Sequence, residues 1–398
     1  TVSVAEEEGA EDKPMVQETP ATSYAANGTA FTSDTGVKYK VTGTGEVEVT
    51  GCEDSVTKLV IPQTVFYEGV EYTVASIEEE AFDYYTFKKN NKNLQITSVD
   101  LSNASLVIGK RAFRGLSQLT EVVGMDNITE ISEAAFNGCK VLEKVSKLSS
   151  LTSVDTMAFM NCSALTDLDE IDWSSLTHIG QQAFANDEKL SISLDENTFK
   201  SLKTLGTGVF SGMTRMTGTV VFPESITEIP ENTFSNTGIT NVDFSHVTAI
   251  GNNAFSKCAG LTELKLSDSI ITIGDKAFKE TGISGELILP DSITTIGSYA
   301  FQMTDISSVK WSHALKTIGA QAFHKCEQLG GALNLPEGVT SIGKAAFAST
   351  AITELQLPDS LQTISDSAFE NCTQLTSVQI GEKNCGASNL VSIGQRAF

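Results

Sequence analysis

Phenylalanine recurs along this chain at a period close to 23 residues, and this recurrence constrains the fold more than any other feature. An aliphatic residue stands five positions before each of fourteen phenylalanines, usually in the pattern Ile-Gly-x-x-Ala-Phe. Most intervals are 21 to 26 residues, and only the first, of 31, and the last, of 29, are longer. A unit this short cannot bury its own apolar face, so successive units are predicted to stack into one continuous core. The anchors are Phe82, Phe113, Phe136, Phe159, Phe184, Phe210, Phe234, Phe255, Phe278, Phe301, Phe323, Phe347, Phe369 and Phe398.

Each unit is predicted to contribute a strand to a common sheet. In residues 255–278 the spacing Leu261-x-x-Leu264-x-Leu266 is typical of a repeat strand, and equivalent segments recur in other units. Alternation along the strand points Leu264 and Leu266 inward and leaves Glu263 and Lys265 facing out.

A turn, a second extended piece and a corner are predicted to complete each unit. Pro or Asp-Ser after the strand marks the turn, and residues 294–296 are an extended piece that ends at Gly297. Glycine would supply permissive dihedrals at this corner, and a helical turn would then carry Ala300 and Phe301. Three units hold one additional residue beside a glycine, which predicts bulges at the strand entries marked by Gly218, Gly285 and Gly331.

Before the array, residues 24–76 have a different pattern. Val37–Val41 and Val47–Val49 alternate with period two, and Glu68-Gly69 separates two further alternating runs, as in a β-hairpin. We interpret this segment as a β-rich N-terminal cap that covers the open edge of the first coil. The predicted organisation is therefore a tail over 1–23, a cap over 24–76 and a repeat array over 77–398.

The two ends of the chain suggest processing. Residues 1–23 are acidic and are predicted to be disordered, and the chain starts without Met. A removed export signal would leave such a start, as would a trimmed fragment, and we favour the first. The sequence stops at Phe398 within a unit, so a C-terminal cap is expected to be missing.

Charge and composition narrow the class of partner. The net charge of −23 argues against nucleic acid, because phosphate binding needs clustered Lys and Arg. The sequence has no apolar run of about 18 residues, the length that would suggest membrane insertion.

The repeated unit Ile-Gly-x-x-Ala-Phe-x-x-Cys-x-x-Leu-x-x-Val/Leu-x-Leu-Pro, with the cap patterns Val-x-Tyr-x-Val and Val-Ile-Pro, resembles the BspA-like, or Treponema-type, leucine-rich repeat family. The resemblance covers about residues 74–398 and implies a right-handed, curved leucine-rich-repeat solenoid of about 14 coils, α+β or mostly β. It also implies a secreted or surface-attached bacterial protein whose relatives include adhesins for host matrix proteins or other bacteria. Units near 184–222 and around Cys385 depart from the pattern, and we expect a change of curvature at both.

Cysteine and histidine positions favour structural roles. Cys139, Cys162, Cys258, Cys326 and Cys372 each stand three residues after an anchor Phe, so we expect buried free thiols, with a Cys139–Cys162 bridge as the main alternative. The four histidines lack metal-ligand spacing and are expected at the surface: His178, His246, His313 and His324. No catalytic residue, metal site or cofactor is predicted, because no nucleophile motif or enclosed carboxylate pair is evident.

The outward strand positions remain as a candidate binding surface. They form a broad, polar, mixed-charge column with few aromatic side chains. Its predicted ligand-binding residues are Asp167, Asp169, Asn241, Asp243, Glu263, Lys265, Glu286, Ser308, Lys310, Glu354 and Gln356.

The leading functional hypothesis is a non-enzymatic, monomeric, secreted or cell-surface protein. It would bind a host matrix protein, a bacterial surface protein or a glycan through this strand-lined face. Two alternatives stay open: a structural stalk that displays another module, and a surface hydrolase.

Overall fold

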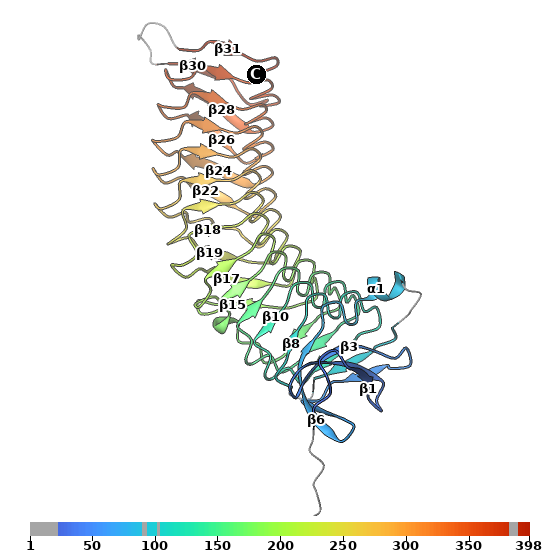
Figure 1. The fold of residues 1–398 in the computed structure, drawn as a ribbon. Helices are drawn as coiled ribbons and strands as arrows, with labels where there is room; N and C mark the ends of the chain where they lie inside the picture. The colour runs from blue at the N-terminus through green and yellow to red at the C-terminus, as the bar shows by residue number, and fades with distance from the viewer. Residues whose placement is uncertain (1–22, 90–93, 102–103, 382–388) are drawn as a thin grey trace, which may run out of the picture.

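The computed structural model describes residues 23–89, 94–101, 104–381 and 389–398 as a β-cap followed by a bent solenoid (Figure 1). The acidic tail predicted over 1–23 lies outside these residues except for its last position, and Cys385 also lies outside them. Within the described chain, no helix is both long and apolar enough to cross a membrane.

Each typical coil contributes two strands, one to each of two parallel stacks. We call the stack built from the Leu-x-x-Leu segments the front face and the stack that precedes each corner the back face. The front strands are β4 (Lys58–Val60), β7 (Ser98–Asp100), β9 (Glu121–Val123), β11 (Lys144–Val145), β13 (Asp167–Leu168), β15 (Ser193–Leu194), β17 (Thr217–Val221), β19 (Asn241–Asp243), β22 (Ser284–Ile288), β24 (Asp305–Lys310), β26 (Gly330–Asn334), β28 (Ala351–Leu357) and β30 (Ser377–Ile380).

The back strands are shorter and more regular. They form one run of four strands and one of eight, with a first strand that joins the cap. They are β8 (Val107–Ile108), β10 (Glu130–Ile131), β12 (Ser153–Val154), β14 (His178–Ile179), β16 (Thr204–Leu205), β18 (Glu228–Ile229), β20 (Ala249–Ile250), β21 (Thr272–Ile273), β23 (Thr295–Ile296), β25 (Thr317–Ile318), β27 (Ser341–Ile342), β29 (Thr363–Ile364) and β31 (Ser392–Ile393).

The anchor phenylalanines form one continuous ladder between the two faces. Successive rings from Phe82 to Phe398 stack with centroids 5.2 to 6.1 Å apart and planes within 24° of parallel. All the rings before Phe398 are buried. The prediction that neighbouring units share one core is confirmed.

The backbone around each anchor is not a helical turn, so that prediction was wrong. Two residues before each of the fourteen phenylalanines, φ is positive, between 52° and 62°. This left-handed residue points the Phe N–H along the solenoid axis, where it bonds to the next coil: the Phe255 N–H donates to the Ala277 carbonyl oxygen at 2.8 Å. A left-handed non-glycine residue costs roughly 1–2 kcal/mol. The bond between coils and the buried ring offset that cost.

Glycine is needed at the Ile-Gly corner because a side chain would clash with the neighbouring coil, and not because the backbone there needs unusual dihedral angles. Gly274, Gly297 and Gly343 are not in the left-handed region. A Cβ on Gly297 would lie 2.5 Å from the Gly274 carbonyl carbon, and one on Gly343 would lie 2.5 Å from the Ala320 nitrogen. The coils approach too closely there for a side chain, which corrects the dihedral explanation.

In many coils the position three residues after the anchor Phe carries a second ladder, of hydrogen-bonded side chains. Each described thiol at this position donates to the carbonyl oxygen of the previous anchor Phe, as in Cys139 to Phe113 at 3.1 Å. Burial raises the pKa of the Cys139 thiol to about 12. The cysteines are free, and Cys139, Cys162, Cys258 and Cys326 are buried while Cys372 is half-buried. The prediction of free thiols is therefore confirmed, and Cys139 and Cys162 are not bridged.

Asp187 occupies this same ladder position and is fully buried. Its Oδ1 accepts a hydrogen bond from the Cys162 N–H at 2.8 Å, whereas its Oδ2 is buried without a partner. Burial holds the pKa of this carboxyl well above its ordinary value, which favours the neutral acid.

The cap is a strongly curled sheet with the strand order β1-β2-β3-β6-β5. Its strands are β1 (Ala30–Thr32), β2 (Val37–Gly43), β3 (Glu46–Cys52), β5 (Thr64–Tyr67) and β6 (Val70–Ile77), and β6 pairs in parallel with β8 of the first coil. The predicted hairpin is confirmed. Tyr67 pairs with Val70, and Glu68 and Gly69 between them have φ values of 50° and 78°, as a type I′ turn requires.

The solenoid bends near β15 and β17, where Figure 1 shows two arms meeting at an angle. Two consecutive coils are widened there: Leu168 to Ile179 and Leu194 to Leu205 are each eleven residues apart, against nine from Leu287 to Ile296. The extra residues bring in Trp173, at the start of the 3-10 turn η1 (Trp173–Ser175), and Phe199. Trp173 packs at a tilt against Phe184, and Phe199 stacks on Phe210. The predicted change of curvature over 184–222 is confirmed, and the one predicted at Cys385 lies outside the described residues.

Two further features differ from the sequence prediction or were missed by it. No strand forms over residues 261–266, although Leu264 and Leu266 pack against the core. The Ser284 N–H still bonds to the Thr262 carbonyl oxygen at 3.1 Å. The short helix α1 (Tyr84–Lys89) occupies part of the long first interval. Register shifts occur at Gly285 and Gly331, where bulges were predicted, but the residue left unpaired is Ser307 or Thr353 on the partner strand. Neither pairing of β17 has a register shift at Gly218, so the bulge predicted there is not found.

Replacing one ladder ring should destabilise the whole array. We expect Phe278→Ala to lower the free energy of unfolding by roughly 3–5 kcal/mol, because it leaves a cavity between two stacked rings. The exposed Lys265→Ala should change it by less than about 0.5 kcal/mol. Urea titration of both variants measures the difference, and equal effects would contradict the inward and outward assignments.

Asp187 should make stability depend on pH. Its carboxyl binds a proton more tightly in the folded than in the unfolded state, so the free energy of unfolding should fall as pH rises above about 4. Asp187→Asn keeps the shape and the acceptor without ionising, and should remove this slope and gain about 1–3 kcal/mol at pH 7. Urea titrations between pH 4 and 8 test this, and parallel slopes in both proteins would contradict the assignment.

Candidate functional site

The predicted ligand-binding residues all point to solvent from the front face or its flanks. Each one is exposed or half-buried, in agreement with the alternation argument. Strand pairing divides them into groups, however, because the front strands form four separate sheets rather than one.

The structure brings together the candidates on the arm beyond the bend. Glu286 pairs with Ser308, and Lys310 pairs with the exposed Ile288, in the sheet formed by β22 and β24. In the next sheet, Glu354 and Gln356 lie on β28 opposite Ala332 and Asn334 of β26. Ser377 and Gln379 of β30 pair in register with Glu354 and Gln356, so the rows of polar side chains continue onto the next strand.

The candidates before and at the bend are more isolated. Asp167 pairs in register with Lys144, whose Nζ lies 3.5 Å from the Asp169 carboxylate. Asn241 and Asp243 belong to another sheet, on β19. The hydroxyl and N–H of Ser245 donate to the Asp243 carboxylate and hold its pKa below the ordinary value, so this side chain stabilises its own turn.

Glu263 and Lys265 do not form part of a strand. Their side chains are 74% and 83% exposed and contact each other, with Lys265 Nζ 3.3 Å from Glu263 Oε2. This mutual pair at a highly exposed site contributes little stability and leaves both groups accessible.

Apolar side chains on the front face were partly missed by sequence reasoning. Val378 and Ile380 were predicted to point inward, but they are 43% and 40% exposed. Both lie on β30, which in the described chain has a front-strand neighbour on only one side. Together with Ile288 they add an apolar component to the mainly polar face beyond the bend.

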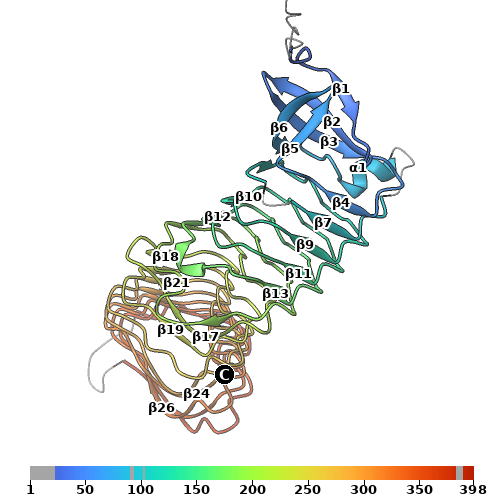
Figure 2. The same cartoon turned by 90° about the horizontal axis from the view of Figure 1, so that it is seen from below.

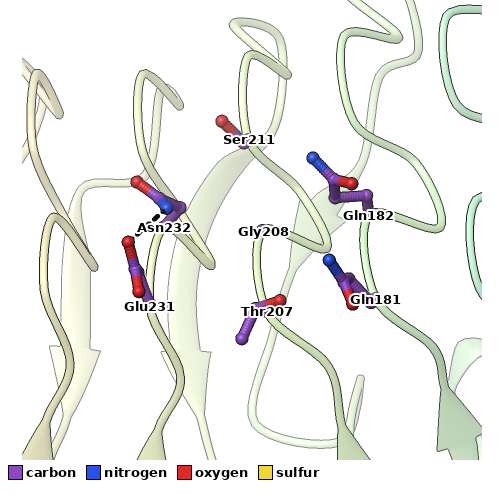
Figure 3. A pocket seen from close by; sticks show the side chains of 7 residues that line it. All are labelled: Gln181, Gln182, Thr207, Gly208, Ser211, Glu231 and Asn232. Atoms are coloured by element: carbon purple, nitrogen blue, oxygen red, sulfur yellow. Dashed lines mark hydrogen bonds between the residues drawn. The ribbon is translucent and has the colours of Figure 1, made fainter.

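A separate hollow lies at the bend, on the edge formed by the turns that carry the anchor phenylalanines, which we call the Phe turns. It has a volume of about 280 Å³, and Figure 3 shows Gln181 and Gln182 on one side of Thr207 and Gly208, with Glu231 and Asn232 on the other. The hollow exists because Gly208 has no side chain at a position where the neighbouring coils carry Gln182 and Asn232. Asn232 Nδ2 already donates to Glu231 Oε1 at 3.1 Å, so part of the lining is internally bonded.

The histidines do not converge. The His313 ring lies 2.8 Å from the Asp291 carboxylate at the surface, and the half-buried His324 contacts the Gln302 amide at 2.9 Å. Burial lowers the pKa of His324. Among the described residues, no three His, Cys, Asp or Glu side chains are grouped so that they could hold a metal ion.

Two solved structures of bacterial proteins share this fold. A leucine-rich cell surface protein from Faecalibacterium prausnitzii A2-165 has a TM-score of 0.55 and 23% identity, with 89% of this chain and 96% of that chain covered. A leucine-rich repeat protein from Bacteroides ovatus ATCC 8483 has a TM-score of 0.63 and 24% identity, with 92% and 90% covered. At these identities the likeness establishes the leucine-rich-repeat solenoid fold.

Sequence comparison gives the family directly. No curated protein matches the chain. The family described as BspA type Leucine rich repeat region (6 copies) matches residues 76–200, 177–307 and 294–398, which together span the solenoid. The chain therefore belongs to the BspA type leucine-rich repeat family.

Proposed function

We propose that this chain is a non-enzymatic, secreted or cell-surface protein that binds a macromolecular ligand, a protein or a glycan, through its front face. The observation that carries the proposal is the alignment of exposed side chains beyond the bend. Parallel pairing places Glu286 beside Ser308 and Ile288 beside Lys310, and repeats the arrangement with Glu354 and Gln356 one sheet further on.

The chemistry of this surface favours many weak contacts over one anchor. Binding energy in protein interfaces usually concentrates in Trp, Tyr and Arg. The aligned front-face side chains beyond the bend instead include carboxylates, amides, one Lys and three exposed aliphatic groups, each available for a modest contact. A long ligand that follows the strands could combine such contacts, since every coil repeats the same spacing.

The location of the protein is inferred from its relatives. The Faecalibacterium prausnitzii structure is described as a leucine-rich cell surface protein, and this chain shares its fold. A host matrix protein, a bacterial surface protein or a polysaccharide outside the cell is then the natural class of partner.

Neutralising the charges beyond the bend tests the proposal. The variant Glu286→Gln, Lys310→Gln and Glu354→Gln should weaken binding to any host matrix protein or polysaccharide that the wild type binds saturably, by at least about tenfold, as expected when roughly 1.4 kcal/mol or more is lost. The matched control changes Lys325, Glu327 and Glu370 to Gln on the Phe turns, with the same change in net charge, and should bind normally. Biolayer interferometry against immobilised ligands measures both.

Two outcomes would contradict the proposal. Saturable binding that is equal in the two variants would place the site elsewhere. A folded array that binds none of the ligands would instead support the alternative of a structural stalk.

A further inference from the structure

The N-terminal cap contains a cavity that the repeat array does not explain. β1 and β5 are the two edges of the cap sheet in hydrogen-bonding order, yet the rings of Phe31 on β1 and Tyr67 on β5 stack with centroids 4.4 Å apart. The sheet therefore curls until its edges meet through this aromatic contact. Figure 2 shows the curled strands of the cap. Beside this contact lies a cavity of about 550 Å³, within the range of about 300–1,000 Å³ usual for small-ligand sites.

One side of the cavity is apolar and partly exposed. Phe66 is 65% exposed and Val60 is 42% exposed, and both line the cavity together with Pro62. Phe66 points away from the cap core on the outer side of β5, where its register partner is Glu71. Phe66 and Val60 therefore offer two neighbouring exposed apolar side chains to a ligand in this cavity.

The aromatic support behind this surface is rigid. Phe31 is stacked between Tyr39, at 5.4 Å, and Tyr67. Tyr39 is fully buried in the cap core. Both faces of Phe31 are covered, so the cavity does not offer the cage of free aromatic faces that a quaternary or methylated ammonium group would need.

The opposite rim is polar and acidic. The β1–β2 turn contributes Thr32, Ser33, Asp34 and Thr35, and the hairpin contributes Glu68. In the described part of the chain, Asp34 is exposed and has neither a hydrogen bond nor an ion pair. The described lining contains carboxylates but no Lys or Arg, so it offers an anionic ligand no positive charge.

We propose that this cavity binds a neutral carbohydrate, with a sugar ring laid against Phe66 and Val60 and its hydroxyl groups hydrogen-bonded by Asp34 and the hydroxyls of the β1–β2 turn. A sugar ring matches the two sides of the cavity because its C–H face is apolar and its edge carries donors and acceptors together. Carboxylates accept hydrogen bonds from sugar hydroxyls, and Ser and Thr can both donate and accept. The cavity borders the first front strand, β4, through Val60, but it shares no residue with the front-face strands beyond the bend, so neither proposal requires the other.

The test uses the full chain and uncharged oligosaccharides built from glucose, galactose or mannose, titrated by isothermal calorimetry. We expect at least one to bind, and Phe66→Ala and Asp34→Asn each to weaken it at least tenfold. Tyr85→Ala and Asp54→Asn are matched controls at exposed positions outside the cavity and should leave binding unchanged. Because Phe66 and Asp34 are exposed, both cavity variants should keep the wild-type unfolding midpoint, which separates loss of binding from loss of folding.

The proposal is overturned if no neutral oligosaccharide binds, or if binding is the same in the cavity variants and the wild type. It is also overturned if only anionic glycans or lysine-rich peptides bind to the cavity. Binding weakened by the front-face variant Glu286→Gln, Lys310→Gln and Glu354→Gln, but not by Phe66→Ala, would assign the sugar to the front face instead.

Discussion

Stacking of one phenylalanine per coil is the interaction on which the rest of this structure depends. The ring fills the space between a front strand and a back strand that are too short to form a core by themselves, since many back strands have only two residues. Each ring also packs against the rings before and after it, so its burial is shared by three coils. The array therefore resembles a one-dimensional chain in which neighbouring contacts, rather than a single central core, supply the stability.

The backbone is adapted to keep those rings in line. A left-handed residue two positions before each Phe directs the Phe N–H to the next coil, and glycine at most corners lets the backbones approach more closely than a Cβ would allow. The thiol or hydroxyl three positions after Phe then bonds a Phe carbonyl oxygen, as Cys258 does with Phe234 and Thr281 does with Phe278. These hydrogen bonds satisfy a row of buried Phe carbonyl oxygens, which would cost stability if they had no partner. Asp187 is an exception within the row, with one buried oxygen that has no partner.

The sequence was sufficient to predict the features that repeat. The Phe period determined the number of coils and the buried positions. Trp311 occupies the strand position equivalent to Leu266, and its contacts with Phe323 and Phe347 agree with the inward orientation that alternation predicts. The left-handed residues could not be recognised because side chains as different as Lys276, Tyr299 and Ala345 occupy that position, and the constraint acts on the backbone alone. No strand forms over 261–266 although its leucine spacing matches that of other coils, so the spacing alone does not determine where a strand forms.

The candidate sites, like the fold, were only partly predictable from the sequence. Alternation correctly placed the front-face residues in solvent, but the division of that face into four sheets follows from bulges and from the two widened coils at the bend. The cap cavity was missed because Phe31 and Phe66 lie on different strands, and only the curl of the sheet brings the two edges together. Sequence periodicity thus predicts which side chains face out, whereas the three-dimensional curvature decides which of them can act on one ligand.

Hydrogen exchange at the anchor phenylalanines tests the central claim most directly. Each buried Phe N–H is bonded to the neighbouring coil inside turns that look like surface loops, for example from Phe278 to Ala300 at 2.8 Å. If the stacked rings hold the coils together, these amides should exchange as slowly as those of the back strands, on both sides of the bend. Exchange at the rate of an unstructured peptide would contradict the account.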